Sequence, residues 1–247
     1  MASTLVPPKP RSEGFRPEIT RLPEHNRRRR IVRWLLRALS RFLVWLYTDT
    51  KAYGLERIPE NGPLLVVSNH LGDADLIVGL ASTSLSIDPV AKVELIDYRM
   101  LGKIMDAYGV IWVHRGQPDR RALRAAIEGI RQGRAVAIAP EGRESLTGSL
   151  EEGMGGAAYM AIKTKAPIMP VTITGTENWR IFGNIKRFKR TPVTLTVGPL
   201  FFLEPSTDLR EGIRAGTEKI MLTLALQLPP EYQGVYSGTG NTMEVNT

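Results

Sequence analysis

Two polar side chains five residues apart are the first candidates for chemistry in this sequence. His70 follows the apolar run Leu64–Val67, which is typical of a buried strand, and Asp75 lies where a helix is expected to begin. A turn between strand and helix would bring the carboxylate to one imidazole nitrogen and leave the other free to accept a proton. The pair is therefore a candidate general base. The alternative is a hydrated loop histidine that happens to precede an aspartate.

Two later apolar runs also end in charged residues. The runs at 109–113 and 135–139 are followed by Arg115 and by Glu141–Arg143. Ligands of parallel sheets gather outside the carboxyl ends of the strands, so these residues are expected to converge on His70. Arginine is suited to holding a phosphate, whereas we interpret His114 as a structural or incidental residue.

The elements that must position these residues alternate between strands and helices. This alternation predicts an α/β fold with a single mixed, largely parallel sheet flanked by helices. Further strands are expected at 168–173 and 193–197. Pro170 lacks an amide hydrogen, which predicts an edge position or an irregular ladder for the first of these two strands.

Composition excludes several kinds of site. The 247 residues contain no cysteine and only three histidines, so we expect no disulfide, no thiol nucleophile, no metal and no bound cofactor. Residues 1–51 hold twelve Lys/Arg and four Asp/Glu, a surplus of eight, while the remainder holds 21 of each. The basic charge thus belongs to one segment, which argues against a general nucleic-acid-binding function.

The basic segment contains a long apolar stretch that begins after four arginines. Arg29, Arg33, Arg37 and Arg41 recur every four residues, which on a helix makes one basic stripe. The apolar stretch 31–47 is short and interrupted by three arginines, which disfavours a membrane span. We predict an interfacial helix at 27–48 whose arginines face the phosphates of anionic lipids. The alternative is an ordinary helix packed on the body with its arginines in water.

The remaining boundaries follow from composition. We expect a disordered leader at 1–26, a catalytic domain at 52–230 and a polar tail at 231–247. The stretch 179–190 interleaves aromatic with basic residues. It is either a second membrane contact or a solvated loop with a few packed aromatic residues.

This set of residues suits direct acyl transfer. The sequence contains no nucleophile elbow, P-loop, dinucleotide fingerprint or zinc-protease motif. A single histidine with a carboxylate partner can deprotonate an alcohol held near an activated thioester. Arginines would bind a phosphate on the acceptor or the donor, and no covalent enzyme intermediate is needed.

Four sequence blocks resemble the glycerolipid acyltransferase family, that of the 1-acylglycerol-3-phosphate acyltransferases. In order they are Asn69-His70 with Asp75, Gly109–Arg115, Pro140–Ser145 and Ala166–Val171. The resemblance implies an acyltransferase fold with His70 as general base, Asp75 as its partner, and Glu141, Gly142, Arg115 and Arg143 around the substrate. It also implies a monotopic enzyme at the cytoplasmic face of a membrane that uses acyl-CoA or acyl carrier protein.

Two departures from the family pattern concern the acceptor. Glu144 stands where the family usually has arginine, with Arg143 one place earlier, and Gly153-Met154 replaces a common Phe-Lys pair. Lysophosphatidate is our first choice of acceptor, and another lysolipid or an amino-lipid alcohol is the alternative. The rival classes are a non-catalytic lipid-binding protein and an esterase or thioesterase. Acyl-chain length and oligomeric state are not encoded in these patterns.

Overall fold

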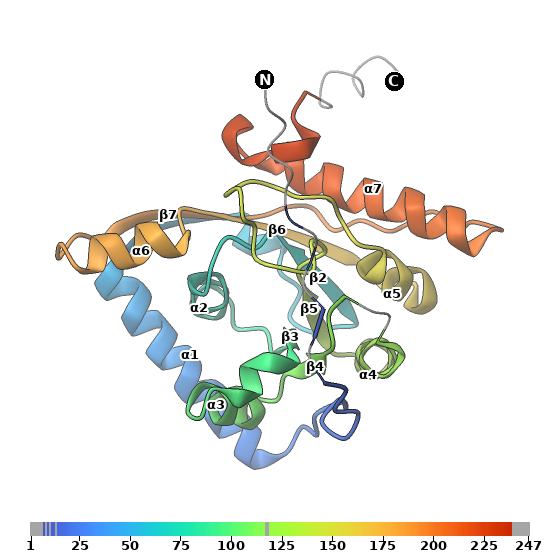
Figure 1. The fold of residues 1–247 in the computed structure, drawn as a ribbon, viewed down its shortest axis with the longest axis horizontal. Helices are drawn as coiled ribbons and strands as arrows, with labels where there is room; N and C mark the ends of the chain where they lie inside the picture. The colour runs from blue at the N-terminus through green and yellow to red at the C-terminus, as the bar shows by residue number, and fades with distance from the viewer. Residues whose placement is uncertain (1–6, 8, 10, 13, 117–118, 239–247) are drawn as a thin grey trace.

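A computed structural model describes residues 7, 9, 11–12, 14–116 and 119–238 of the chain. Within these residues the strands form one mixed sheet with helices on both faces, as Figure 1 shows. The strands are β1 (Thr48–Tyr53), β2 (Leu64–Ser68), β3 (Ile87–Lys92), β4 (Ile111–Val113), β5 (Ala135–Ile138), β6 (Ile168–Thr174) and β7 (Thr191–Val197). The helices are α1 (Arg27–Tyr47), α2 (Ala74–Ser82), α3 (Leu101–Tyr108), α4 (Arg120–Arg131), α5 (Gly156–Thr164), α6 (Asn178–Ile185) and α7 (Leu209–Gln227). Short 3-10 helices span Leu55–Arg57, Val93–Asp97, Pro230–Tyr232 and Gly234–Tyr236.

The sheet has the strand order β1-β7-β6-β2-β5-β3-β4. Its neighbouring strands are parallel except for β6 and β7, which pair antiparallel. The predicted single, largely parallel sheet is therefore confirmed. Because β2, β5 and β4 run in the same direction, the residues after their carboxyl ends emerge at one edge of the sheet.

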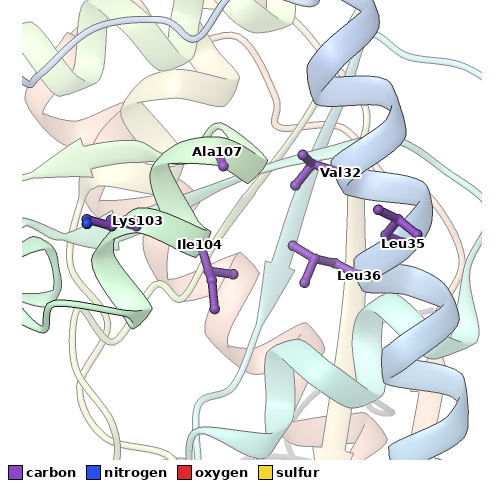
Figure 2. A pocket seen from close by; sticks show the side chains of 6 residues that line it. All are labelled: Val32, Leu35, Leu36, Lys103, Ile104 and Ala107. Atoms are coloured by element: carbon purple, nitrogen blue, oxygen red, sulfur yellow. The ribbon is translucent and has the colours of Figure 1, made fainter.

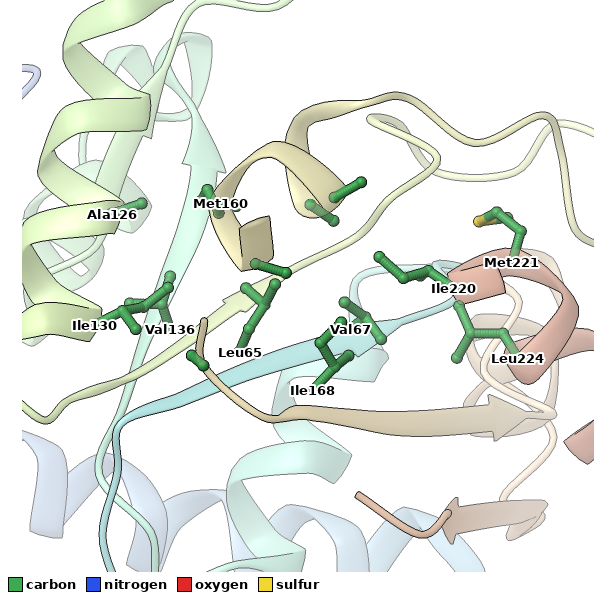
Figure 3. Packing of buried hydrophobic residues seen from close by; sticks show 14 of the residues in the cluster. Leu65, Val67, Ala126, Ile130, Val136, Met160, Ile168, Ile220, Met221 and Leu224 are labelled. Carbon is green, nitrogen blue, oxygen red and sulfur yellow. The ribbon is translucent and has the colours of Figure 1, made fainter. Parts of the chain in front are cut away.

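The central strand β2 is buried on both faces, which explains its unbroken apolar sequence. Leu65 and Val67 pack with α4, α5 and α7, and Figure 3 shows this cluster. Leu64 and Val66 point the opposite way, into a cluster that includes Val78 of α2. Alternate side chains of β2 thus pack against the helices on the two faces of the sheet. This packing fixes the position of the residues that follow β2.

Strand β6 corrects one prediction. It lies inside the sheet between β7 and β2, although Pro170 predicted an edge strand or an irregular ladder. The ladder with β7 begins at Val171, one residue after the proline. The carbonyl of Pro170 accepts a hydrogen bond from the Gly198 amide at 2.8 Å. The missing amide hydrogen therefore falls at the end of the β7 ladder, while on the other side Pro170 stays in the parallel ladder with β2, opposite Val67.

Helix α1 is present, but its basic stripe faces the protein, so the prediction that the arginines face lipid phosphates is wrong. Arg33 is buried and donates to Asp88 at 2.5 Å and to the Tyr108 carbonyl at 2.9 Å. Asp88 is fully buried, and such a carboxylate requires a cationic partner. Arg37 and Arg41 likewise donate to carbonyls of the body.

The outward side of α1 consequently carries apolar side chains. Those exposed to a third or more are Ile31, Trp34, Leu35, Leu39, Phe42, Trp45, Leu46 and Tyr47. Among the described residues, no helix has the length and apolarity needed to cross a bilayer. Between α1 and α3 lies an apolar groove of about 250 Å³, and Figure 2 shows Leu36 and Ile104 facing each other across it.

The described part of the leader runs along the body. Lys9 donates to the carbonyls of Glu141 and Glu152, and Ser12 bonds the backbone of Arg115. Residues 239–247 of the predicted tail and much of the first thirteen residues lie outside the described residues. The domain boundaries at 26, 48 and 230 stay predictions.

Candidate active site

His70 emerges from β2 in a loop that is tied to the neighbouring strand. The side chain of Asn69 pairs with Ile173 of β6, donating to its carbonyl and accepting from its amide, both at 2.8 Å. The His70 carbonyl accepts from the Ser145 amide at 2.8 Å. These bonds hold the backbone on both sides of His70, so the position from which the imidazole projects is fixed.

His70 and Asp75 form the pair that their spacing predicted. Nδ1 of His70 lies 2.8 Å from Oδ2 of Asp75, and that oxygen also accepts from the amides of Leu71 and Gly72. The other oxygen accepts from the Thr176 hydroxyl. A carboxylate surrounded by donors is an acceptor, so it places the imidazole proton on Nδ1.

The second ring nitrogen is available for chemistry. Among the described residues, Nε2 of His70 has no hydrogen-bond partner, and the side chain is 35% exposed. Burial lowers the pKa of His70, but the hydrogen bond and charge of Asp75, with Glu144 and Glu141 nearby, outweigh it and raise the pKa above 6.5. The imidazole is thus an accessible base with a strengthened affinity for protons.

Glu141 and Gly142 shape the loop beside His70. Glu141 is buried, and its two oxygens accept from the amides of His70 at 3.1 Å and Glu151 at 2.8 Å. Burial raises the pKa of Glu141 to about 7, although both amides act in the opposite direction. Gly142 has a φ of 73°, and a Cβ there would lie 2.5 Å from the Met154 sulfur, so the turn requires glycine.

The two arginines predicted to bind substrate have different surroundings. Arg115 lies beside the 140–145 loop, where Nη1 donates to the Gly142 carbonyl at 3.4 Å and Nε is buried without a partner. Arg143 is buried in an ion pair with Glu151 at 2.7 Å. The expected convergence of three strand ends is therefore present. The role of Arg143 stays a prediction, because its charge already has a carboxylate partner.

Sequence reasoning missed two residues that support the pair, Asn69 and Thr176. Asn69 stands directly before His70 at the end of an apolar strand, and a polar amide in that place was the available signal. Thr176 lies 101 residues from Asp75, so no local pattern connects them. Glu144 also lies at the site, where its Oε1 accepts from the Asn178 side chain at 2.9 Å.

Comparison with known proteins decides the family. The family model described as Acyltransferase matches residues 49–174, which is just over half of the chain. The chain belongs to the acyltransferase family. The matched span of this acyltransferase contains His70, Asp75 and the 140–145 loop, so the family assignment and the geometry concern the same residues.

Several proteins that this acyltransferase resembles are named as 1-acylglycerol-3-phosphate acyltransferases. The 1-acyl-sn-glycerol-3-phosphate acyltransferase of Borreliella burgdorferi is 28% identical over 60% of each chain. The human 1-acyl-sn-glycerol-3-phosphate acyltransferase beta is 27% identical over 85% of this chain and 76% of its own. The crystal structure of the 1-acyl-sn-glycerophosphate (LPA) acyltransferase PlsC from Thermotoga maritima has a TM-score of 0.62 at 25% identity. It covers 81% of this chain and 80% of that one.

The chain spans 60% of the length of the Borreliella burgdorferi protein and 44% of a chloroplastic relative from Brassica napus. The similarity to these two relatives therefore covers only part of their length. Together with the structural match, it places this fold among those of lysophosphatidate acyltransferases.

Proposed function

We propose that the protein is an O-acyltransferase that moves a fatty acyl group from acyl-CoA or acyl carrier protein to the free hydroxyl of 1-acylglycerol-3-phosphate, giving phosphatidate. The observation that carries this proposal is the His70–Asp75 pair with its accessible Nε2. The names of the relatives support the choice of acceptor.

The proposed reaction requires no covalent enzyme intermediate and no bound cofactor. Nε2 of His70 takes the proton of the acceptor hydroxyl while that oxygen bonds to the thioester carbonyl carbon. The carbon–sulfur bond then breaks, and the leaving thiolate takes the proton back from the imidazolium. Asp75 keeps Nδ1 protonated throughout and stabilises the imidazolium that forms.

Arg115 is the residue we propose to bind the acceptor phosphate. Its half-buried guanidinium lies beside the 140–145 loop and, within the described residues, makes only a long hydrogen bond to the Gly142 carbonyl, so other donors remain for a phosphate oxygen. Burial lowers the pKa of Arg115, yet a guanidinium stays charged at any physiological pH. Arg143 can take part only where its ion pair with Glu151 opens.

A membrane surface is the proposed location, at the cytoplasmic face. The outward apolar side of α1, with Trp34 and Trp45 among its exposed residues, suits the interface of a bilayer that contains anionic lipids. Helix α1 packs on α2, which carries Asp75 in its first turn. Attachment through α1 would therefore hold the site close to its lipid substrate. We propose no nucleic-acid partner.

Glu144 favours a second candidate acceptor. This carboxyl group lies close enough to His70 to raise the pKa of the histidine, and it stands where the resemblance predicts an arginine. A negative charge in that place repels a phosphate and attracts a cation. A lysolipid or amino-lipid alcohol with an ammonium group is therefore the alternative acceptor for the same chemistry.

An acyl-transfer assay in detergent or liposomes tests these proposals. It uses palmitoyl-CoA with a panel of phosphate-bearing and amine-bearing lysolipids, reads the products by mass spectrometry, and includes His70→Ala. Acylated lysophosphatidate that disappears in the variant is the expected result. Product from an amine-bearing acceptor alone would select the alternative. Free fatty acid would indicate a hydrolase, and lipid binding with no product would indicate a non-catalytic protein.

A further inference from the structure

Helix α6 and the turn after it expose aromatic rings between cations. We define the α6 patch as Trp179, Phe182, Lys186, Arg187, Phe188 and Lys189, all of which are exposed. Ile181 and Ile185 on the opposite side of the helix pack into the core cluster that contains Leu64. The residues of the α6 patch therefore do not contribute to packing of the core. Exposed aromatic groups of this kind mark interaction sites.

Phe188 occupies a backbone position that is unfavourable for it. The Lys189 amide donates to the Asn184 carbonyl and the Phe188 amide to the Ile185 carbonyl, the pattern of a Schellman helix end. Phe188 is the left-handed residue of this motif, with a φ of 54°, where glycine is usual. Its ring is 100% exposed, so no contact within the described structure compensates for that conformation. A partner outside the chain would account for a bulky ring held in this way.

The cations of the α6 patch are also available to a partner. Within the described residues, the side chains of Lys186, Arg187 and Lys189 make no ion pair or hydrogen bond. The next residue, Arg190, donates to the carbonyl of Thr48, the C-cap residue that follows α1, at 2.8 Å. The patch therefore adjoins the end of α1, and Figure 1 shows α6 beside that end of the helix.

The two surfaces supply complementary groups. The exposed side of α1 ends in Phe42 and Trp45, while the arginines of its stripe point into the body. The α6 patch adds exposed cations and three further aromatic rings at this end of α1, whereas Arg27, Arg28 and Arg30, exposed arginines of the helix itself, lie at its other end. Aromatic rings at the level of the headgroups and cations near the phosphates are the two features that bind a protein to an anionic membrane.

The opposite end of α6 touches the candidate active site. Thr176, two residues before the helix, donates to Asp75, and the Asn178 side chain bonds Glu144 and the Asp73 amide. An eight-residue helix is about 12 Å long. One short rigid element therefore joins the α6 patch to the groups that hold His70 in place.

We propose that the α6 patch is a second membrane contact that binds the surface of an anionic bilayer. It extends the attachment proposed above for α1 and does not depend on acyl transfer. A protein attached through α1 alone could rotate about the axis of that helix. A second contact, through the α6 patch, would fix its orientation on the membrane. The strand-end loop with His70 then faces the bilayer in one defined way.

Because the chain contains no cysteine, single cysteines can carry an environment-sensitive fluorophore at chosen positions. The full chain is labelled through Phe188→Cys in the α6 patch, Trp45→Cys in α1, or Phe202→Cys as an exposed control between β7 and α7. Phosphatidylcholine vesicles with phosphatidylglycerol should shift the emission of the 188 and 45 probes to the blue. A nitroxide-bearing lipid should quench both probes, with the 202 probe unchanged. A response at 45 without one at 188 overturns the second contact, whereas 188 without 45 overturns only the attachment through α1.

Charge variants test the same contact without a probe. Lys186→Gln/Arg187→Gln/Lys189→Gln should weaken binding to the anionic vesicles about 100-fold, since each cation near such a surface contributes about fivefold. The matched control, Arg120→Gln/Arg124→Gln/Arg131→Gln, removes three exposed cations from α4, which Figure 1 shows far from α6. Equal losses in the two variants would mean general electrostatic attraction and would overturn the proposal. Binding only to an acidic polypeptide or RNA, with none to vesicles, would overturn it as well.

Discussion

Two histidines in this fold have the same arrangement and opposite surroundings. His70 and Asp75 have the spacing His-x4-Asp, and His114 and Asp119 repeat it. Each histidine follows a parallel strand, each aspartate lies at the start of a helix, and the Nδ1–Oδ2 distances are 2.8 and 2.7 Å. By spacing, strand and pairing, the two dyads are equivalent.

They differ at the second ring nitrogen. Nε2 of His114 accepts a hydrogen bond from the Arg16 amide at 2.9 Å, and the ring of Phe15 lies 4.9 Å away. The His114 side chain is fully buried, whereas that of His70 is 35% exposed. A histidine whose lone pair is already used by the backbone cannot take a substrate proton. The spacing therefore defines a way to hold an imidazole, and what covers Nε2 decides whether it serves structure or catalysis.

The largest contrast is expected from removing each imidazole and measuring acyl transfer. His70→Ala should lower kcat by about 10²–10⁴-fold, because the proposed general base is lost. His114→Ala should keep kcat within about threefold when rates are normalised to folded protein, because Nε2 of His114 is already occupied by the Arg16 amide. A threefold rate difference corresponds to less than about 1 kcal/mol. Initial rates and circular dichroism of both variants check this. An equal loss in both would end the distinction between the dyads.

Asp75→Asn tests the partner of the accessible histidine. An amide can donate to Nδ1 and so favours the wrong tautomer, and we expect kcat to fall about 100-fold. Thr176→Val removes one hydrogen bond from the same carboxylate and should cost only about fivefold. Single-turnover rates at saturating acceptor distinguish these effects from weaker binding. The order of the two losses is the informative result.

The pH profile should reflect the environment of His70. The neutral imidazole is the active form, so kcat/KM should rise with pH and level off above the pKa, which Asp75 holds above 6.5 against the effect of burial. Glu144→Gln removes a negative charge that raises this pKa, so the rising limb should move to lower pH. Profiles of the natural chain and this variant between about pH 5 and 9 provide the comparison. A limb that stays in place would assign it to another group, for which Glu141, with a pKa of about 7, is the first choice.

The two histidine variants should affect stability in the opposite order to activity: His114→Ala should destabilise the fold more than His70→Ala. His114→Ala leaves the Arg16 amide and one carboxylate oxygen of Asp119 short of partners in a buried place, at a cost of about 3 kcal/mol. For a domain of this size, that corresponds to a fall in Tm of about 6–12 °C. His70→Ala loses one partly exposed contact and should lower Tm by about 2–4 °C. Thermal unfolding by calorimetry measures both.

The smallest effect separates the Arg16 backbone from its side chain. Arg16→Ala keeps the amide that bonds His114 and removes only an exposed ion pair with Asp97, so the free energy of unfolding should stay nearly unchanged. A chain that begins at Arg21 loses that amide together with the packing of Ile19 and the Ser12–Arg115 hydrogen bonds, so its free energy of unfolding should fall clearly further. Denaturant unfolding of the two variants shows whether the Arg16 side chain or the rest of the segment provides the stabilisation.

Local patterns predicted the sheet because apolar runs such as Leu64–Val67 are short, continuous and bounded by turns. They predicted the His70 dyad because both members lie within five residues. They failed where distant partners decide. Arg33 turns inward because of Asp88, 55 residues later. Arg143 is paired with Glu151 across a loop whose path no periodicity reveals.

The pairing of β1 has a consequence for the order of events during synthesis. Within the described part of the chain this edge strand pairs only with β7, and Thr48 meets Thr191, which is made 143 residues later. At about 5–20 residues per second, β1 and the helix before it wait roughly 7–30 s for their partner strand. Asp49 and Lys51 place charges on the waiting strand, which disfavours pairing with other chains. If α1 binds a membrane as proposed above, it can do so while the sheet beside it is still open, and β7 would then complete the edge on an attached chain.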